Sequence, residues 1–199
     1  VPTPRYGKPV EINALWYNAL KIAEEFSKEM HIKYDTKLVT KVKESFGKFY
    51  TDHGLLDVIE PTSNKVRPNQ IIAIGLDYSP VDPEKAKDIL DVVEEKLYTP
   101  QGLKTLSSEH DEYRGYYEGG VYSRDMSYHQ GTVWPWLLQF YFEASRKYGG
   151  KYTKLEDAHA MIEEDCIGSI SEIYDADEPR LPKGAYSQAW SVAMAILNN

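Results

Sequence analysis

The chain has 199 residues, of which 42% are hydrophobic, and its formal net charge is −8. This length can bury one sizeable core, so we expect one domain or one large piece of a domain covering residues 1–199. The negative charge argues against nucleic acid as a partner, because phosphate binding needs clusters of Lys and Arg that the sequence does not contain.

The longest clean apolar run, residues 71–76, is far too short to cross a bilayer, so no membrane partner is expected. The single Cys166 excludes an internal disulfide framework. We therefore expect a soluble, cytoplasmic protein. The sequence begins with Val1 rather than Met, which indicates an excised fragment of a longer parent.

Four helices are predicted in the first half of the chain, at residues 9–30, 35–50, 68–78 and 82–97. In the first, apolar residues recur every three or four positions, which predicts its buried face: Ile12, Leu15, Ala19, Ile22, Phe26 and Met30. The second and fourth carry charges on one face and should be outer helices. The third is apolar almost all round and should be buried.

Residues 98–131 form a long polar and aromatic segment with five glycines and no helical or strand period. A loop of this length in a compact domain is normally functional or disordered, and its aromatic content argues against disorder. Three further helices are predicted at residues 132–148, 154–167 and 187–197. Of these, the first and last are broadly apolar, and the middle one is charged on one face.

Broadly apolar helices thus alternate with half-charged ones, which is typical of stacked hairpins in an α-solenoid or a closed toroid. The absence of a fixed sequence period argues against a repeat solenoid. Polar and aromatic residues gather where the inner helices begin, as expected for an enzyme pocket on a toroid axis. We predict an all-α (α/α)6 toroid, of which this chain supplies roughly the C-terminal half, with the missing helices before Val1.

The segment RDMSYHQGTVWPW mixes indole rings with oriented donors and acceptors, which suits a sugar with apolar faces and hydroxyl rims. The alternative is a loop whose Trp residues fill core and whose His holds the backbone. The predicted substrate ligands lie here or at the starts of the other inner helices: Glu11, Asn13, Trp16, Tyr17, Arg124, Asp125, His129, Gln130, Trp134, Trp136, Gln188 and Trp190.

Five collinear stretches resemble the C-terminal amylo-α-1,6-glucosidase domain of glycogen debranching enzymes: PRYGKPVEINALWYNAL, RPNQIIAI, LYTPQGLKTLS, SRDMSYHQGTVWPWLL and GAYSQAWSVAM. The resemblance covers almost the whole chain. It implies an (α/α)6 toroid related to glucoamylases. It also implies hydrolysis, with inversion, of the α-1,6-linked glucose at branch points of glycogen or limit dextrin.

Inverting hydrolysis needs a general acid and a general base. Glu172 is the candidate base, because it lies at the predicted mouth between apolar residues, and the resemblance points to the same loop; the alternative is a solvated carboxylate in an acidic stretch. The acid resembles an Asp in a Trp-Met-Asp segment that this chain lacks, so we expect it upstream of Val1. Asp125 and Glu11 are the substitutes.

The upstream remainder of the parent chain is therefore an expected partner, and the isolated fragment is expected to be inactive. No metal site is predicted, because the five His residues are scattered. No nucleotide cofactor is expected, because no phosphate-cradling Gly motif occurs. Two other functions stay open: another toroidal glycosidase, such as a glucoamylase or trehalase-like enzyme, and a non-catalytic carbohydrate-binding helical module.

Overall fold

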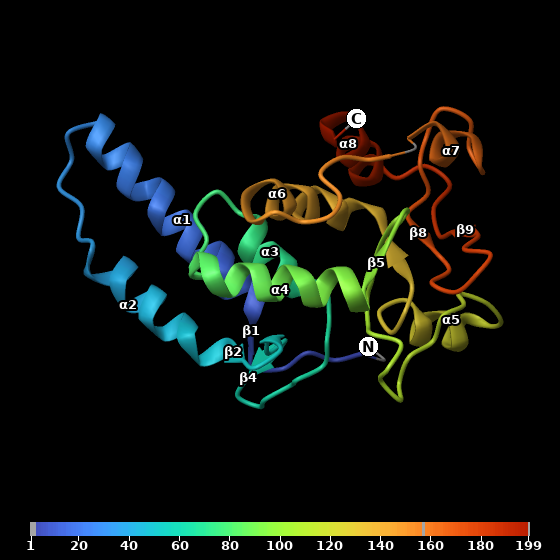
Figure 1. The fold of residues 1–199 in the computed structure, drawn as a ribbon, viewed down its shortest axis with the longest axis horizontal. Helices are drawn as coiled ribbons and strands as arrows, with labels where there is room; N and C mark the ends of the chain where they lie inside the picture. The colour runs from blue at the N-terminus through green and yellow to red at the C-terminus, as the bar shows by residue number, and fades with distance from the viewer. Residues whose placement is uncertain (1–2, 157, 199) are drawn as a thin grey trace.

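The computed structural model describes residues 3–156 and 158–198, in which helices are the main regular elements (Figure 1). The α-helices are α1 Val10–Glu29, α2 Lys37–Phe46, α3 Asn69–Gly75, α4 Pro83–Lys96, α5 Val121–Ser127, α6 Leu138–Tyr148, α7 Ala158–Glu163 and α8 Ala189–Asn198. Two short 3₁₀ turns are η1 Gly47–Phe49 and η2 Pro135–Leu137. No helix in the described residues is both long enough and apolar enough to span a membrane.

Short antiparallel strands join these helices, so the expected all-α architecture is too simple. The strands are β1 Lys8–Pro9, β2 Tyr50–Thr51, β3 Gly54–Leu55, β4 Val58–Ile59, β5 Tyr98–Thr99, β6 Gly102–Lys104, β7 Val133–Trp134, β8 Ile173–Tyr174 and β9 Pro182–Lys183. β1 pairs with β4, β2 pairs with β3, and β5 to β9 form one five-stranded sheet in sequence order. Strands of two or three residues are too short for an alternating pattern to reveal.

Apart from α7, the predicted helices pack as an inner and an outer set. α1 packs against α3, α3 against α6, and α6 against α8, while α2 packs against α1 and α4 against α3 and α6. α3 is buried from Gln70 to Gly75, as its uniformly apolar sequence predicts. A Cβ at Gly75 would lie 2.6 Å from the carbonyl oxygen of Phe140, so glycine permits the close approach of α3 to α6.

The predicted buried face of α1 is wrong. Ile12 and Phe26 are 56% and 59% exposed, whereas the side chains that face the protein include Val10, Ala14 and Leu20. Helix α1 therefore has two apolar stripes. In the inward stripe, Val10 and Ala14 join the main core with α3, whereas Tyr17 and Leu20 pack in a separate cluster with α2. The stripe that contains Ile12 and Phe26 faces outward.

Several predicted boundaries also need correction. The helix expected at residues 132–148 begins later, because Val133 pairs with both β6 and β8 and a 3₁₀ turn follows at Pro135. The helix expected at 154–167 is reduced to α7, and its Asp157 lies outside the described residues. The segment 98–131, expected to be irregular, contains β5, β6 and α5.

Candidate active site

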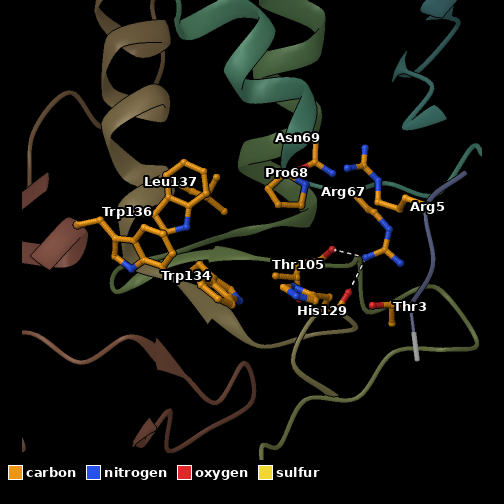
Figure 2. Close-up of a pocket in the computed structure, with 11 residues that line it drawn as sticks. Thr3, Arg5, Arg67, Pro68, Asn69, Thr105, His129, Trp134, Trp136 and Leu137 are labelled. Carbon is orange, nitrogen blue, oxygen red and sulfur yellow. Dashed lines mark hydrogen bonds between the residues drawn. The ribbon is translucent and has the colours of Figure 1, made fainter. Parts of the chain in front are cut away.

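A cavity of about 430 Å³ lies at the N-terminal ends of α1, α3, α6 and α8 (Figure 2). This position agrees with the expectation that the starts of the inner helices share one mouth. Its lining residues are Thr3, Arg5, Arg67, Pro68, Asn69, Thr105, His129, Trp134, Trp136, Leu137 and Trp190. In Figure 2 the indoles of Trp134 and Trp136 lie on one side and the two arginines on the other.

The aromatic side of the cavity is continuous. The ring centroids of Trp136 and Trp190 are 5.9 Å apart, and those of Trp190 and Trp134 are 6.0 Å apart. The His129 ring stacks on Trp134 at 5.6 Å. Trp134 is only 7% exposed, whereas Trp190 is 46% exposed. Such a wall of ring faces can stack on the CH face of a sugar.

The charged side of the cavity is built around Asp57. Arg5 donates from Nε and Nη2 to the two Asp57 carboxylate oxygens, both at 2.9 Å, and from Nη1 to Glu11 at 2.6 Å. Asn69 donates to Asp57 at 2.8 Å. Burial alone would lower the pKa of Arg5, but the two carboxylates outweigh it and raise that pKa. The arginine charge is therefore balanced by carboxylates within the protein.

Arg67 ties the start of α3 to the loop that carries His129. Its side chain is buried and donates to the carbonyl oxygens of Thr105 at 3.0 Å and His129 at 2.5 Å, and to the Gln130 side-chain oxygen at 2.5 Å. Burial lowers the pKa of Arg67. Arg67 was not among the predicted site residues; the only sequence signal was its place in the RPNQ helix start.

His129 lines the cavity beside these cations. Its ring packs against both Tyr128 and Trp134, with centroid distances of 4.8 Å and 5.6 Å. Part of the residue is exposed, but desolvation by the packed rings, followed by repulsion from Arg67 and Arg5, lowers the pKa of His129. At neutral pH the imidazole is therefore uncharged and can both donate and accept a hydrogen bond.

Glu172 lies directly before β8, and the pairing of Val133 with Tyr174 places its strand beside the strand of Trp134. Its carboxylate accepts a 2.5 Å hydrogen bond from the Tyr128 hydroxyl and a 3.1 Å bond from the Ala185 N–H. Glu172 does not line the cavity itself. Tyr128 connects the two, because its ring centroid is 4.9 Å from that of Trp134.

The loop that follows Glu172 is clamped to residues 113–117. Tyr113 donates its hydroxyl to Asp177, the Tyr117 N–H donates to Asp175, and the Ala176 N–H donates to the Gly115 carbonyl, each at 2.7 Å. A Cβ at Gly115 would lie 1.8 Å from the Asp177 carboxylate, so a larger residue there would displace that side chain. Burial, followed by the bond to Asp177, raises the pKa of Tyr113, which keeps its phenol protonated.

Four of the predicted sugar ligands line the cavity: His129, Trp134, Trp136 and Trp190. Two others lie next to it with their polar groups bonded within the protein. Glu11 binds Arg5, and the Gln130 amide binds Arg67 through its oxygen and Glu112 through its nitrogen. The contact of any of these residues with substrate stays a prediction.

The other six predicted ligands do not line this cavity. Asn13 donates to the Pro9 carbonyl, Trp16 is 51% exposed on α1, and Tyr17 is buried in a separate cluster with Leu20 and Val39. On α5, Asp125 is exposed and Arg124 lies 5.9 Å from the Tyr117 ring.

Gln188, the last of the six, precedes α8, and its side-chain oxygen accepts from the Ala189 N–H. The helix starts do share one mouth, but the side-chain directions at α1 and α5 were not predictable from the sequence.

In the described residues, no group of three or more His, Cys, Asp or Glu side chains is placed to hold a metal ion.

Solved structures that share this fold include glycoside-processing enzymes of the (α/α)6 toroid type. A GH63 mannosylglycerate hydrolase from Thermus thermophilus superposes with a TM-score of 0.70 at 15% identity, over 94% of this chain and 44% of its own. Neutral trehalase from Saccharomyces cerevisiae superposes with a TM-score of 0.65 at 17% identity, over 93% of this chain and 36% of its own.

At the sequence level, the chain is 28% identical over 159 residues to the glycogen debranching enzyme of Saccharomyces cerevisiae. That match covers 66% of this chain and 10% of the yeast protein, so the chain spans only a small part of its curated relative. The model of the amylo-alpha-1,6-glucosidase family matches residues 1–197, and the chain therefore belongs to that family.

Proposed function

We propose that these residues form part of a glycoside hydrolase that removes α-1,6-linked glucose from branch points of glycogen or limit dextrin, with inversion at the anomeric carbon. The observation that carries the proposal is the placement of Glu172. Its carboxylate is fixed by two donors directly before β8, which pairs with the strand of Trp134. Tyr128 connects it to a cavity walled by three indoles. Membership of the amylo-alpha-1,6-glucosidase family supports the choice of linkage.

In this proposal Glu172 is the general base. Its carboxylate takes a proton from a water molecule, whose oxygen attacks the anomeric carbon from the face opposite the leaving group. The glycosidic C–O bond breaks as a general acid protonates the leaving oxygen. Trp134, Trp136 and Trp190 stack on the sugar, and the neutral His129 ring bonds to a hydroxyl.

We infer that the general acid comes from a segment outside these 199 residues, so the fragment alone does not turn over substrate. The Trp-Met-Asp segment expected to hold the acid does not occur in this sequence, and the solved structures with this fold are more than twice as long as the part matched. Bare apolar side chains support a partner of this kind. On α8, Ile196 and Leu197 are 75% and 68% exposed, and the large stripe of α1 faces outward.

The test is glucose release from a phosphorylase-limit dextrin by the longest natural chain that carries these residues, with and without Glu172→Gln. This change removes the base and keeps the shape, so we expect a loss of at least about a hundredfold with dextrin binding retained. Glu178→Gln is the matched control, because Glu178 is an exposed carboxylate in the same acidic loop and should leave the rate unchanged.

Near-normal hydrolysis by the Glu172→Gln variant would move the base to another carboxylate. A second candidate function follows from the fold shared with the trehalase and the GH63 hydrolase, namely another toroidal glycosidase. A panel of trehalose, maltose and branched dextrin separates the linkages. Binding without hydrolysis of any of them by the unaltered protein would favour a carbohydrate-binding module.

A further inference from the structure

Tyr128 occupies a central place between the aromatic wall and Glu172. It follows α5 directly, and its ring is half-buried among three others, with centroid distances of 4.8 Å to His129, 4.9 Å to Trp134 and 5.8 Å to Tyr117. These contacts fix the ring, so its hydroxyl has little freedom to leave Glu172. The hydroxyl lies 2.5 Å from Oε1 of Glu172, which is the short distance typical of an O–H donor to a carboxylate.

A second donor holds the other carboxylate oxygen. The Ala185 N–H donates to Oε2 at 3.1 Å, while the Glu172 N–H donates to the Ala185 carbonyl at 2.9 Å. Gly184, with φ of +73°, makes this approach possible, because a Cβ there would lie 2.5 Å from Oε2. Each oxygen therefore receives one donor and keeps lone-pair capacity for a water molecule. An ionised carboxylate only accepts hydrogen bonds, so the Tyr128 hydroxyl and the Ala185 N–H are complementary to it.

The direction of the Tyr128 bond is set by the phenol. Burial, followed by the hydrogen bond to Glu172, raises the pKa of Tyr128, so its hydroxyl stays protonated and donates.

Other charged or titratable side chains surround this pair. They are His129 and Tyr117 beside the Tyr128 ring, Arg124 over the Tyr117 ring, and the Lys183–Asp175 ion pair on the sheet side. His129 interacts electrostatically with Glu172, and near neutral pH the imidazole is uncharged. None of them replaces the direct bond from Tyr128 to the carboxylate.

We propose that Tyr128 is a positioning residue for Glu172: its hydroxyl fixes one carboxylate oxygen and supplies a donor that complements the carboxylate of a general base. The inference rests on the proposed function, in which Glu172 is that base. It assigns a role to a tyrosine that packs behind His129 and Trp134 without lining the proposed sugar cavity itself, and it explains why a half-buried phenol lies between the aromatic wall and a carboxylate.

The test is the pH dependence of glucose release from limit dextrin by the longest natural chain, unaltered and with Tyr128→Phe. Without the donor, the carboxylate takes up a proton more readily, so the acidic limb of the kcat profile should move to higher pH by about one unit. We expect kcat near neutral pH to fall about tenfold and KM to change less than about twofold, because the sugar wall is untouched.

Tyr116→Phe is the matched control. Its hydroxyl donates to the Glu178 carbonyl in the loop after Glu172 but not to the carboxylate, so its acidic limb should stay in place. If Tyr128→Phe fails to fold, 3-fluorotyrosine at position 128 keeps the ring and makes the hydroxyl a stronger donor. That protein should show the acidic limb at lower pH than the unaltered one.

An acidic limb that does not move in either Tyr128 protein would overturn the inference. This failure is distinct from failure of the proposed function, which would appear as near-normal hydrolysis by Glu172→Gln. A drop in kcat with no shift of the limb would reduce Tyr128 to a packing role.

Discussion

The α1–α2 hairpin and the sheet-bearing end of the molecule differ in how sequence relates to structure (Figure 1). α1 is regular in sequence, but its stripe of large apolar residues is exposed. The sequence of the sheet-bearing end has no helical or strand period. Its loops are nevertheless joined by hydrogen bonds, such as those that Asp175 and Asp177 accept. Regular periodicity thus marks where a helix lies, but not what it packs against.

The two regions also differ in how much they contribute to the candidate active site. The residues around the cavity come from four helix starts and from the loops between strands, and several of their polar groups are bonded in pairs. Loops can hold functional groups firmly when each buried donor and acceptor has a partner. The hairpin contributes to the cavity only through the segment before α1, where Thr3 and Arg5 lie.

The largest expected effect is on the free energy of unfolding, when a phenylalanine of the core and one of the α1–α2 hairpin are each replaced by alanine. Phe142 on α6 is 1% exposed, so Phe142→Ala should lower the free energy of unfolding by about 3–5 kcal/mol. Phe26 on α1 is 59% exposed, so Phe26→Ala should change it by less than about 0.5 kcal/mol. Urea unfolding of the two variants measures both.

Phe26→Ala should also reduce self-association of the 199-residue chain in light scattering, because it removes part of a bare apolar stripe. Equal destabilisation by the two variants, or a sharply monomeric unaltered chain, would contradict the exposed state of this face.

A smaller effect is expected from the buried cation of the site. Arg67→Ala leaves the Thr105 and His129 carbonyls and the Gln130 amide oxygen without their donor, so the free energy of unfolding should fall by about 2–4 kcal/mol. Arg124→Ala is the control, because Arg124 is exposed on α5 and should cost less than about 0.5 kcal/mol. A cost for Arg67→Ala as small as that of the control would show that these bonds do not hold the loop.

The sequence predicted the helices of the inner and outer sets, the burial of α3 and the shared mouth at the inner-helix starts. It failed on the large stripe of α1, because two apolar stripes of similar length compete and only the tertiary contacts with α2 and α3 select one. The five-stranded sheet was also missed. Its strands are two or three residues long, and their pairing joins segments as distant as Val133 and Tyr174.

At the site, four aromatic or imidazole residues of the cavity were predictable because indole and imidazole rings stand out at the polar starts of the inner helices. Arg67 and Tyr128 were not selected. A buried arginine is rare, and nothing in its sequence neighbours shows that three acceptors surround it. Tyr128 was one of sixteen tyrosines, and only the fold brings it to Glu172, 44 residues away.

The smallest expected effect is on the pH dependence of the free energy of unfolding, and it compares a histidine from each region. The pKa of His129 is lowered in the folded protein by desolvation and by Arg67 and Arg5, whereas an unfolded chain has the ordinary value of about 6.5. The unfolded state therefore binds a proton first as the pH falls. The stability contributed by the neutral ring is fully present above about pH 6.5 and is lost progressively below it.

Because part of His129 is exposed, solvent screening keeps this loss below about 1 kcal/mol between pH 7 and pH 5. His129→Gln should flatten that part of the curve of unfolding free energy against pH. His31→Asn is the control from the other region, since His31 is exposed in the α1–α2 connection and its φ of 55° suits asparagine. If both variants kept the full slope of unfolding free energy against pH, the cavity would not hold the His129 ring neutral. The electrostatic repulsion between Arg67 and His129 would then be weaker than their contacts indicate.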